Sequence, residues 1–196
     1  MTASDSGYLY HVQVYCGKNK STVDQPEQFG LGHRVVTSLL AAVDDPLKHE
    51  VFFDNLFTSY DLLAHLQKEN IKATGTVREN RLKKCPLMDK RAMRKTERGT
   101  FDAKSDEVVS VVKWHDNQCV TVATNYDTIA SVGKVRRWSA AKKTSVDVQQ
   151  PTVVTNYNLH MGGVDYGMLV YVCVNFSTVV NTSTYRIGLR IRAITI

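Results

Sequence analysis

Strand-like apolar runs alternate with helical patterns along this chain of 196 residues, and this alternation limits its fold class more than any other feature. Residues 50–53 form a short run in which Glu50 is followed by three apolar residues, which is typical of a buried strand. Thr58 then begins a helical pattern as its capping residue, with Asp61 three positions on, and the buried face is formed by Leu62, Leu63 and Leu66. Residues 71–77 return to a β-rich pattern. The mixed order predicts an α/β fold.

Further elements lie on both sides of this unit. Before it, residues 8–15 form a β-rich run ending at Gly17, residues 18–29 read as loop, and a helical face follows, made by Val35, Val36, Leu39, Leu40 and Val43. Asp44-Asp45-Pro46 is expected to end that helix. After it come strand-like runs at 100–104, 107–114 and 118–124, and the turn at Asp116-Asn117 predicts a hairpin between the last two.

The net charge of +6 is concentrated in one segment. Residues 78–98 contain nine basic and three acidic side chains, and nine minus three equals the whole excess. Such a cluster attracts a polyanion, although a solvated connector has the same composition. Because no aromatic residue interrupts the segment, contact with phosphate is favoured over stacking on bases. A second basic group follows at Lys134, Arg136, Arg137, Lys142 and Lys143.

Composition excludes several classes of protein. Hydrophobic residues make up 43% and charged residues 22%, which are globular values and not those of a disordered tail. The four cysteines, Cys16, Cys85, Cys119 and Cys173, have no zinc spacing and are expected to be reduced, with Cys16 and Cys119 in buried packing. The longest weakly polar run, 166–180, is shorter than a membrane span. We therefore expect a soluble, non-secreted protein with no membrane partner.

Three aspartates are the candidate catalytic residues. Asp54 and Asp127 each end an apolar run, and Asp165 follows Gly162-Gly163. Carboxylates that are distant in sequence can converge on a metal site, and hard ions such as Mg²⁺ prefer their oxygens. The alternative for each is structural: a capping or turn aspartate at Asp54, a surface turn at Asp127 and a turn at Asp165.

An ordered set of motifs resembles the catalytic region of piggyBac-type transposases. The segments are residues 51–59 (VFFDNLFTS), 61–63, 73–80 (ATGTVREN), 98–100, 112–117 (VKWHDN), 156–158 and 160–165 (HMGGVD), and residues 7–18 and 30–32 add to them. The resemblance covers about residues 7–165. Taken together, the segments are far more specific than any one of them.

The resemblance implies a ribonuclease H-like fold, a mixed sheet flanked by helices, which we expect to be incomplete at both ends. It implies that Asp54, Asp127 and Asp165 are the catalytic residues and hold two divalent ions, Mg²⁺ or Mn²⁺. In such a site the two ions activate the attacking oxygen and stabilise the leaving oxygen of an in-line displacement at phosphorus. It further implies double-stranded DNA as partner, a homodimer and a nuclear location.

The resemblance also defines expected regions. We expect a remnant of the region before the core at 1–50, a core at 51–165 with an insertion at about 128–155, and a divergent tail at 166–196. Other family members carry a further aspartate where this chain has Met168. The tail has no Asp, Glu or Lys and is β-prone, whereas the family has a basic helical segment there.

Two functions from different classes remain. One is a transposon-derived protein with a DNA transposase catalytic domain that is truncated and inactive. The alternative is a non-catalytic DNA-binding protein that uses the basic segment, through Arg78, Arg81, Lys83, Lys84, Arg91, Arg94 and Lys95. Lys113 and the group Arg136-Arg137-Trp138 are further candidates for phosphate contact, although Trp138 could equally anchor the expected insertion. We expect Trp114 in the core and His160 in a structural turn.

Overall fold

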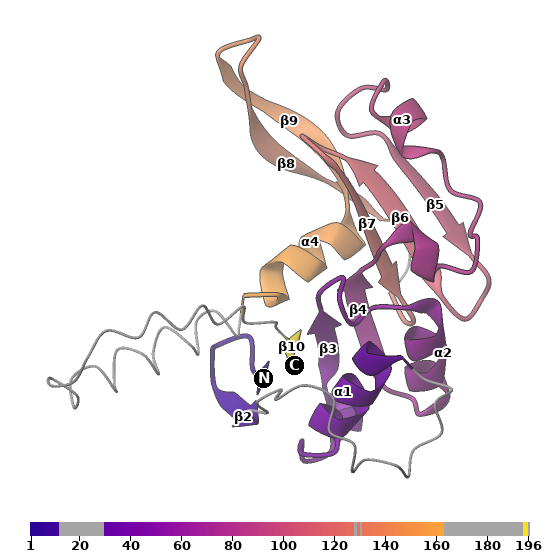
Figure 1. Ribbon diagram of the computed structural model, residues 1–196. Coiled ribbons are helices and arrows are strands. Elements are labelled where there is room, and N and C mark those ends of the chain that lie inside the picture. The colour runs from indigo at the N-terminus through magenta and orange to yellow at the C-terminus, as the bar shows by residue number, and fades with distance from the viewer. Residues whose placement is uncertain (12–29, 128, 130, 163–193, 196) are drawn as a thin grey trace, which may run out of the picture.

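The computed structural model describes residues 1–11, 30–127, 129, 131–162 and 194–195 (Figure 1). Within these residues the backbone forms an eight-stranded mixed sheet and a separate two-stranded hairpin. The remainder of the expected strand at 8–15, the loop at 18–29 and most of the tail lie outside the described residues. Asp165, Met168, Cys16 and Cys173 lie outside them too. Among the helices that the structure describes, none has the length and apolarity to cross a membrane.

The strands of the large sheet lie in the order β2-β1-β10-β3-β4-β7-β6-β5. Their bounds are β1 Thr2–Ala3, β2 Leu9–His11, β3 Glu50–Phe53, β4 Lys72–Thr76, β5 Phe101–Ser105, β6 Ser110–His115, β7 Cys119–Thr124 and β10 Ile194–Thr195. Strand β3 runs parallel to β4, and β4 runs antiparallel to β7. Strands β5, β6 and β7 form an antiparallel meander. The separate hairpin pairs β8 Val132–Ser139 with β9 Thr144–Pro151.

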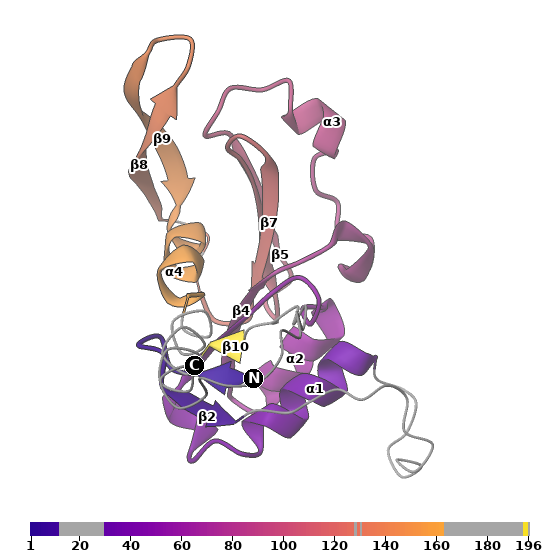
Figure 2. The ribbon, with the colours of Figure 1, turned by 60° about the vertical axis from the view of Figure 1, so that its left-hand side comes forward.

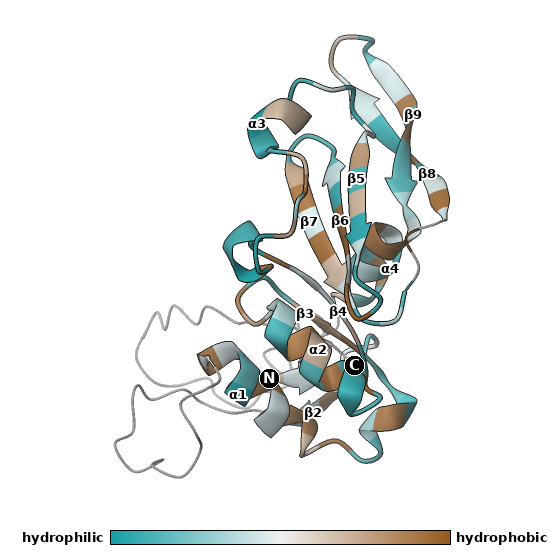
Figure 3. Cartoon of the chain, turned by 90° about the vertical axis from the view of Figure 1, so that its right-hand side faces the viewer, coloured by the Kyte–Doolittle hydropathy of each residue, from teal (hydrophilic) through white to brown (hydrophobic). Residues whose placement is uncertain are grey.

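Helices cover both faces of the sheet. Helices α1 Leu31–Leu40 and α2 Tyr60–Lys68 pack on one face, and α4 Thr152–His160 packs on the other (Figure 2). Helix α2 alternates hydrophobic and hydrophilic residues along its length (Figure 3), as expected of a helix with one buried face. Three short helices complete the described chain: η1 Pro46–Lys48, η2 Glu79–Arg81 and α3 Lys90–Met93.

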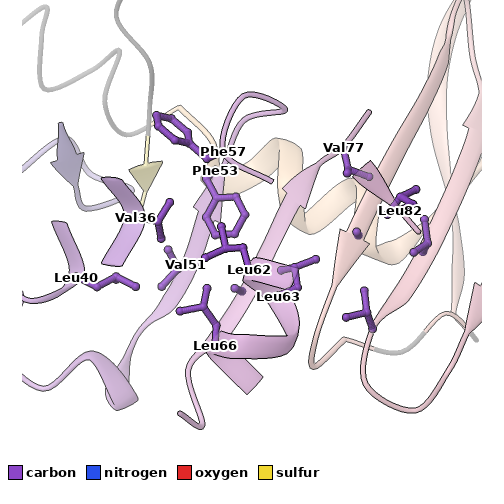
Figure 4. Packing of buried hydrophobic residues seen from close by; sticks show 14 of the residues in the cluster. Val36, Leu40, Val51, Phe53, Phe57, Leu62, Leu63, Leu66, Val77 and Leu82 are labelled. Atoms are coloured by element: carbon purple, nitrogen blue, oxygen red, sulfur yellow. The ribbon is translucent and has the colours of Figure 1, made fainter. Parts of the chain in front are cut away.

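The side chains of β3 divide between two hydrophobic clusters. Val51 and Phe53 join a cluster with α1 and α2, which Figure 4 shows gathered around them, whereas Phe52 joins the cluster under α4. Successive strand residues point to opposite faces, so a strand covered on both faces is apolar throughout. This explains why residues 51–53 are all buried and why the run is continuous in sequence rather than alternating.

The predicted elements are largely confirmed, with shifts at their ends. The strand at 50–53 and the hairpin turn at Asp116-Asn117 are confirmed, and Trp114 is buried as expected. Helix α1 ends at Leu40, before the predicted stop at 44–46, although the next predicted face residue, Val43, is still buried. Cys119 is only partly buried.

The predicted cap of α2 is wrong by one residue. Ser59 is the N-cap, because its Oγ accepts a hydrogen bond from the amide of Leu62 at 3.2 Å. Thr58 is buried and donates its hydroxyl to the carbonyl of Asp54 at 2.8 Å, so it closes the preceding turn instead. The expected region at 128–155 contains the β8–β9 hairpin, and residues 1–3 and α1 belong to the same sheet and core as β3. That 128–155 is an insertion stays a prediction.

Candidate functional site

Asp54 follows β3 and organises the turn that leads to α2. The amide of Leu56 donates to its Oδ1 at 2.8 Å, and the amides of Phe57 and Thr58 donate to its carbonyl at 3.2 and 3.3 Å. Its other carboxylate oxygen has no hydrogen-bond partner among the described residues. The turn thus presents one ordered carboxylate, with an open oxygen, at the edge of the sheet where β3 and β4 end. We name this edge, with the turn 54–58, the Asp54 edge.

Arg81 holds the turn from outside. Its Nη1 donates to the carbonyl oxygens of Asn55 at 3.3 Å and of Thr58 at 3.5 Å, and also to that of Leu56. The guanidinium therefore places a positive charge beside the turn and fixes η2 against it. No local pattern in the sequence indicates this role, because Arg81 is one of many cations in its segment.

Tyr157 of α4 contributes a hydroxyl on the other side. Its Oη lies 3.2 Å from Oγ1 of Thr76, the last residue of β4. Burial raises the pKa of Tyr157, and the negative charge of Asp54 raises it further. Tyr157 is thus a neutral hydroxyl close to Asp54. The motif at 156–158 already carried the resemblance, but nothing in the sequence assigned a role to its tyrosine.

A surface hollow of about 410 Å³ adjoins the Asp54 edge. Asn55 of the turn and Thr76 line it, together with the cations Arg78 and Lys90. Its wall also includes Val77, Glu79, Cys119, Val120 and Thr121. An anion entering this hollow would lie between the turn that carries Asp54 and two positive side chains.

The cations of the basic segment 78–98 fall into two groups: those that bond other residues of the protein and those that are exposed. Arg81 bonds the turn, and Lys83 pairs with Asp61 at 2.5 Å. The other predicted DNA-contact residues are exposed and form no ion pair with a described residue: Arg78, Lys84, Arg91, Arg94 and Lys95. The segment is also an ordered one, since Asp89 caps α3 and Met93 is fully buried.

Lys113 corrects one expectation. It does not face solvent, because it lies in β6, between β7 and β5, and its side chain is 0% exposed. Its Nζ pairs with Glu79 at 3.0 Å and donates to the carbonyl of Met88 at 2.5 Å. Lys113 therefore ties the basic segment to the sheet and is not available to phosphate. Placement in a strand that is buried on both faces is the signal that would have shown this.

Asp127 lies at the opposite edge of the sheet from Asp54. Phe53 pairs with Gly75, and Gly75 pairs with Ala123, so the ends of β3 and β4 lie beside Val122 and Ala123 of β7. Asp127 lies three residues beyond Thr124, the last residue of β7, and β7 runs antiparallel to β4, so the chain after Ala123 runs toward the start of β3 and β4. The four residues of β3 separate the two edges by about 13 Å, at roughly 3.3 Å per residue. The expected convergence of Asp54 and Asp127 is therefore absent.

Contacts around Asp127 confirm its position. The preceding Tyr126 donates to Glu50, the first residue of β3, at 3.0 Å. Asn125 accepts from the amide of Ala73 at 2.8 Å and donates to the carbonyls of Ile71 at 2.9 Å and Leu63 at 3.2 Å. We name this side the Asp127 edge. Its hollow, of about 310 Å³, is separate from the first and is lined by Glu107, Val108, Ser110, Asn125, Tyr126, Asp127 and Ile129.

The third predicted ligand, Asp165, lies outside the described residues, so its place relative to Asp54 stays a prediction. Within the part of the chain that the structure describes, no cluster of three or more His, Cys, Asp or Glu side chains could hold a metal ion. Of the three predicted metal ligands, Asp54 is therefore the one that the described residues place where β3 and β4 end. His160, expected in a turn, ends α4, where its ring stacks on Phe52 at a centroid distance of 5.0 Å.

The second basic group lies on the β8–β9 hairpin. Arg137 and Arg98 share the carboxylate of Asp116, and Trp114 donates to the carbonyl of Gln149 at 2.8 Å. These contacts hold the hairpin against the β6–β7 turn. The ring of Trp138 is 63% exposed, so this ring does not anchor the hairpin in the core.

The sequence of this chain is similar to that of a known protein family. The model of the family described as Transposase IS4 matches residues 1–185. Human PiggyBac transposable element-derived protein 3 is 39% identical over 162 residues, which are 81% of this chain and 27% of that protein. Human PiggyBac transposable element-derived protein 2 is 40% identical over 138 residues, 68% of this chain and 23% of that protein. The chain thus spans about a quarter of the length of these relatives.

A solved structure supports the fold. It is a piggyBac transposase synaptic complex with hairpin DNA, similar at a TM-score of 0.55 and 24% identity, over 79% of this chain and 30% of that one. The expected ribonuclease H-like mixed sheet flanked by helices is confirmed by this likeness. The motifs, the family model and the two human relatives agree with the fold. The chain belongs to the IS4-type transposase family and, within it, to the piggyBac-type transposases.

Proposed function

We propose that this transposon-derived chain binds double-stranded DNA along the Asp54 edge and does not by itself cleave it. The observation that supports DNA binding most directly is the position of exposed cations beside the hollow that adjoins the Asp54 edge. Arg78 and Lys90 line that hollow, and the rest of the exposed group continues along the same segment. Phosphate contacts by such cations supply sequence-independent affinity for DNA.

Asp54 fits one ligand position of a divalent-metal site. Its open carboxylate oxygen is the type of donor that Mg²⁺ or Mn²⁺ prefers. Bound ions would supply charge neutralisation and an activated oxygen for displacement at phosphorus. Asp54 would hold an ion, Arg81 would fix the turn that carries it, and the Tyr157 hydroxyl would remain a proton donor nearby. Asp165 is the proposed further ligand.

Lack of cleavage follows from the carboxylates present. A two-metal site needs several carboxylate oxygens around ions about 4 Å apart. Asp127 lies at the other edge of the sheet, and Met168 stands where family members carry an additional aspartate. Magnesium-dependent nicking of a transposon-end duplex that Asp54→Ala abolishes would contradict this part of the proposal.

DNA binding is tested by its dependence on salt. The triple variant Arg91→Gln, Arg94→Gln and Lys95→Gln removes three exposed cations of the segment. We expect weaker binding to a duplex and a salt slope smaller by about 3, since each phosphate contact contributes about 0.9. The matched control is Lys48→Gln, Lys68→Gln and Lys104→Gln, which removes the same charge elsewhere. Equal effects of the two triples would reject a specific role for the segment.

Location and assembly are part of the same proposal. A DNA-binding chain of this family would act in the nucleus and as a homodimer. Imaging of a tagged full chain tests the first, and light scattering of the purified protein tests the second. Exclusion from the nucleus, or a monomer at micromolar concentration, would contradict the corresponding statement.

A further inference from the structure

Asp127 contacts a helix that reaches both edges of the sheet. Its Oδ2 accepts a hydrogen bond from Nδ2 of Asn156 in α4 at 3.1 Å. Its amide donates to Oγ1 of Thr124, the last residue of β7, at 3.3 Å. The backbone of Asp127 is therefore tied to the end of β7, and its carboxylate holds α4.

The next residue of α4 reaches the Asp54 edge. Tyr157 follows Asn156 directly, and its hydroxyl meets Thr76 close to Asp54. In the preceding turn of the helix, Val153 and Val154 pack in the cluster beneath it. One helix thus has a polar anchor at each edge, and its rotation and position along the sheet depend on both.

We infer that Asp127 is a positioning residue, which sets α4 so that the Tyr157 hydroxyl lies beside Asp54, and that it is not a metal ligand. The inference rests on the proposed role of Asp54 in metal binding. Three observations carry it: the antiparallel course of β7, the two separate hollows, and the Asp127–Asn156 bond.

Amide and alanine substitutions separate the two roles of Asp127. Asp127→Asn removes the charge that a metal ligand needs, but its amide oxygen can still accept from Asn156. Asp127→Ala removes the acceptor as well. A metal ligand would be lost in both variants, whereas a positioning residue would be rescued by the amide.

The experiment combines Mn²⁺ titration with hydrogen exchange on the full chain. Asp54→Asn is expected to weaken Mn²⁺ binding at least about tenfold, and Asp127→Asn is expected to leave it at the unsubstituted level. Exchange of the α4 amides, residues 152–160, is expected to accelerate in Asp127→Ala and in Asn156→Ala, and to stay unchanged in Asp127→Asn. Asn158→Ala, on the exposed side of the same helix, is the control.

The outcomes distinguish the two claims. Loss of Mn²⁺ binding in Asp127→Asn equal to that in Asp54→Asn would overturn the positioning role. Unchanged exchange of α4 in Asp127→Ala would overturn it as well. If Asp54→Asn binds Mn²⁺ normally, the proposed metal role of Asp54 fails, and the exchange data still decide whether Asp127 positions α4.

Discussion

The two edges of the central sheet have opposite chemistry. At the Asp54 edge, one carboxylate with an open oxygen lies near Arg81 and near a hollow bordered by Arg78 and Lys90. At the Asp127 edge, the described residues that line the hollow include Glu107 and Asp127 and no cation, and nearby Lys72 already pairs with Glu50 at 3.5 Å. Because a nucleic-acid backbone is repelled by clustered carboxylates and attracted by cations, the difference indicates that the Asp54 edge is the one that meets phosphate.

Each edge is nevertheless held by the same kind of contact. Arg81 donates to three backbone carbonyls at the first edge, and the amide group of Asn125 bonds three backbone groups at the second. One polar side chain thus closes the loop at each end of the sheet. The two edges therefore differ in the charge of the residues around their hollows. They are alike in that one polar side chain holds the loop at each edge.

The largest expected effect tests how tightly the Asp54 edge is packed. A Cβ on Gly75 would lie 2.4 Å from Oγ1 of Thr58 and 2.7 Å from the carbonyl oxygen of Phe53. Gly75→Ala should lower the free energy of unfolding by more than about 3 kcal/mol, because the opposing backbone cannot move away cheaply. Urea denaturation measures this. Gly133→Ala in β8, where the nearest atom is 3.8 Å away, should change it little.

Removal of the Asn125 contacts tests the loop at the Asp127 edge. Asn125→Ala leaves the amide of Ala73 and two carbonyls without their partner. We expect a loss of roughly 3 kcal/mol in the free energy of unfolding, since unpaired buried groups cost about 1–3 kcal/mol each. Asn117→Ala, in the exposed β6–β7 turn, is the control. A loss no greater than that of the control would show that this loop is not held by Asn125.

Removal of the Arg81 contacts should cost less. Arg81→Ala is expected to destabilise the protein by about 2 kcal/mol, because its carbonyl partners lie in a turn where water can replace part of the hydrogen bonding. Arg94→Ala removes the same charge from an exposed position and should be close to neutral. If both variants unfold at the same denaturant concentration, the guanidinium does not order the Asp54 turn.

The smallest expected effect concerns pH and His33, a buried residue of α1. Burial lowers the pKa of His33, repulsion from His65 lowers it further, and Asp61 opposes the shift. The folded state thus disfavours the protonated ring, so stability is full above the ordinary pKa of about 6.5 and falls as pH drops below it. His33→Gln should reduce the difference in unfolding free energy between pH 7 and pH 5 by less than about 1 kcal/mol. His11→Gln, at an exposed site, should leave that difference unchanged.

Sequence reasoning succeeded where local patterns determine the outcome. The continuous apolar run before Asp54 predicted β3, and the leucine spacing predicted the buried face of α2. It failed where strand direction matters, because an apolar run that ends in aspartate looks the same in a parallel and in an antiparallel strand. This is why Asp127 was expected beside Asp54. The roles of Lys113 and Arg81 depend on tertiary contacts that no local pattern records.

The most direct test of the difference between the edges is to locate a bound ion by backbone cleavage. Fe²⁺ replaces Mg²⁺ in an oxygen-ligand site, and ascorbate with peroxide then generates radicals that cut the chain next to the ion. Cuts near residues 54–58 and 76–81, lost in Asp54→Asn and kept in Asp127→Asn, are the result that we predict. Cuts centred on residues 125–131 would contradict it and would restore Asp127 as a ligand.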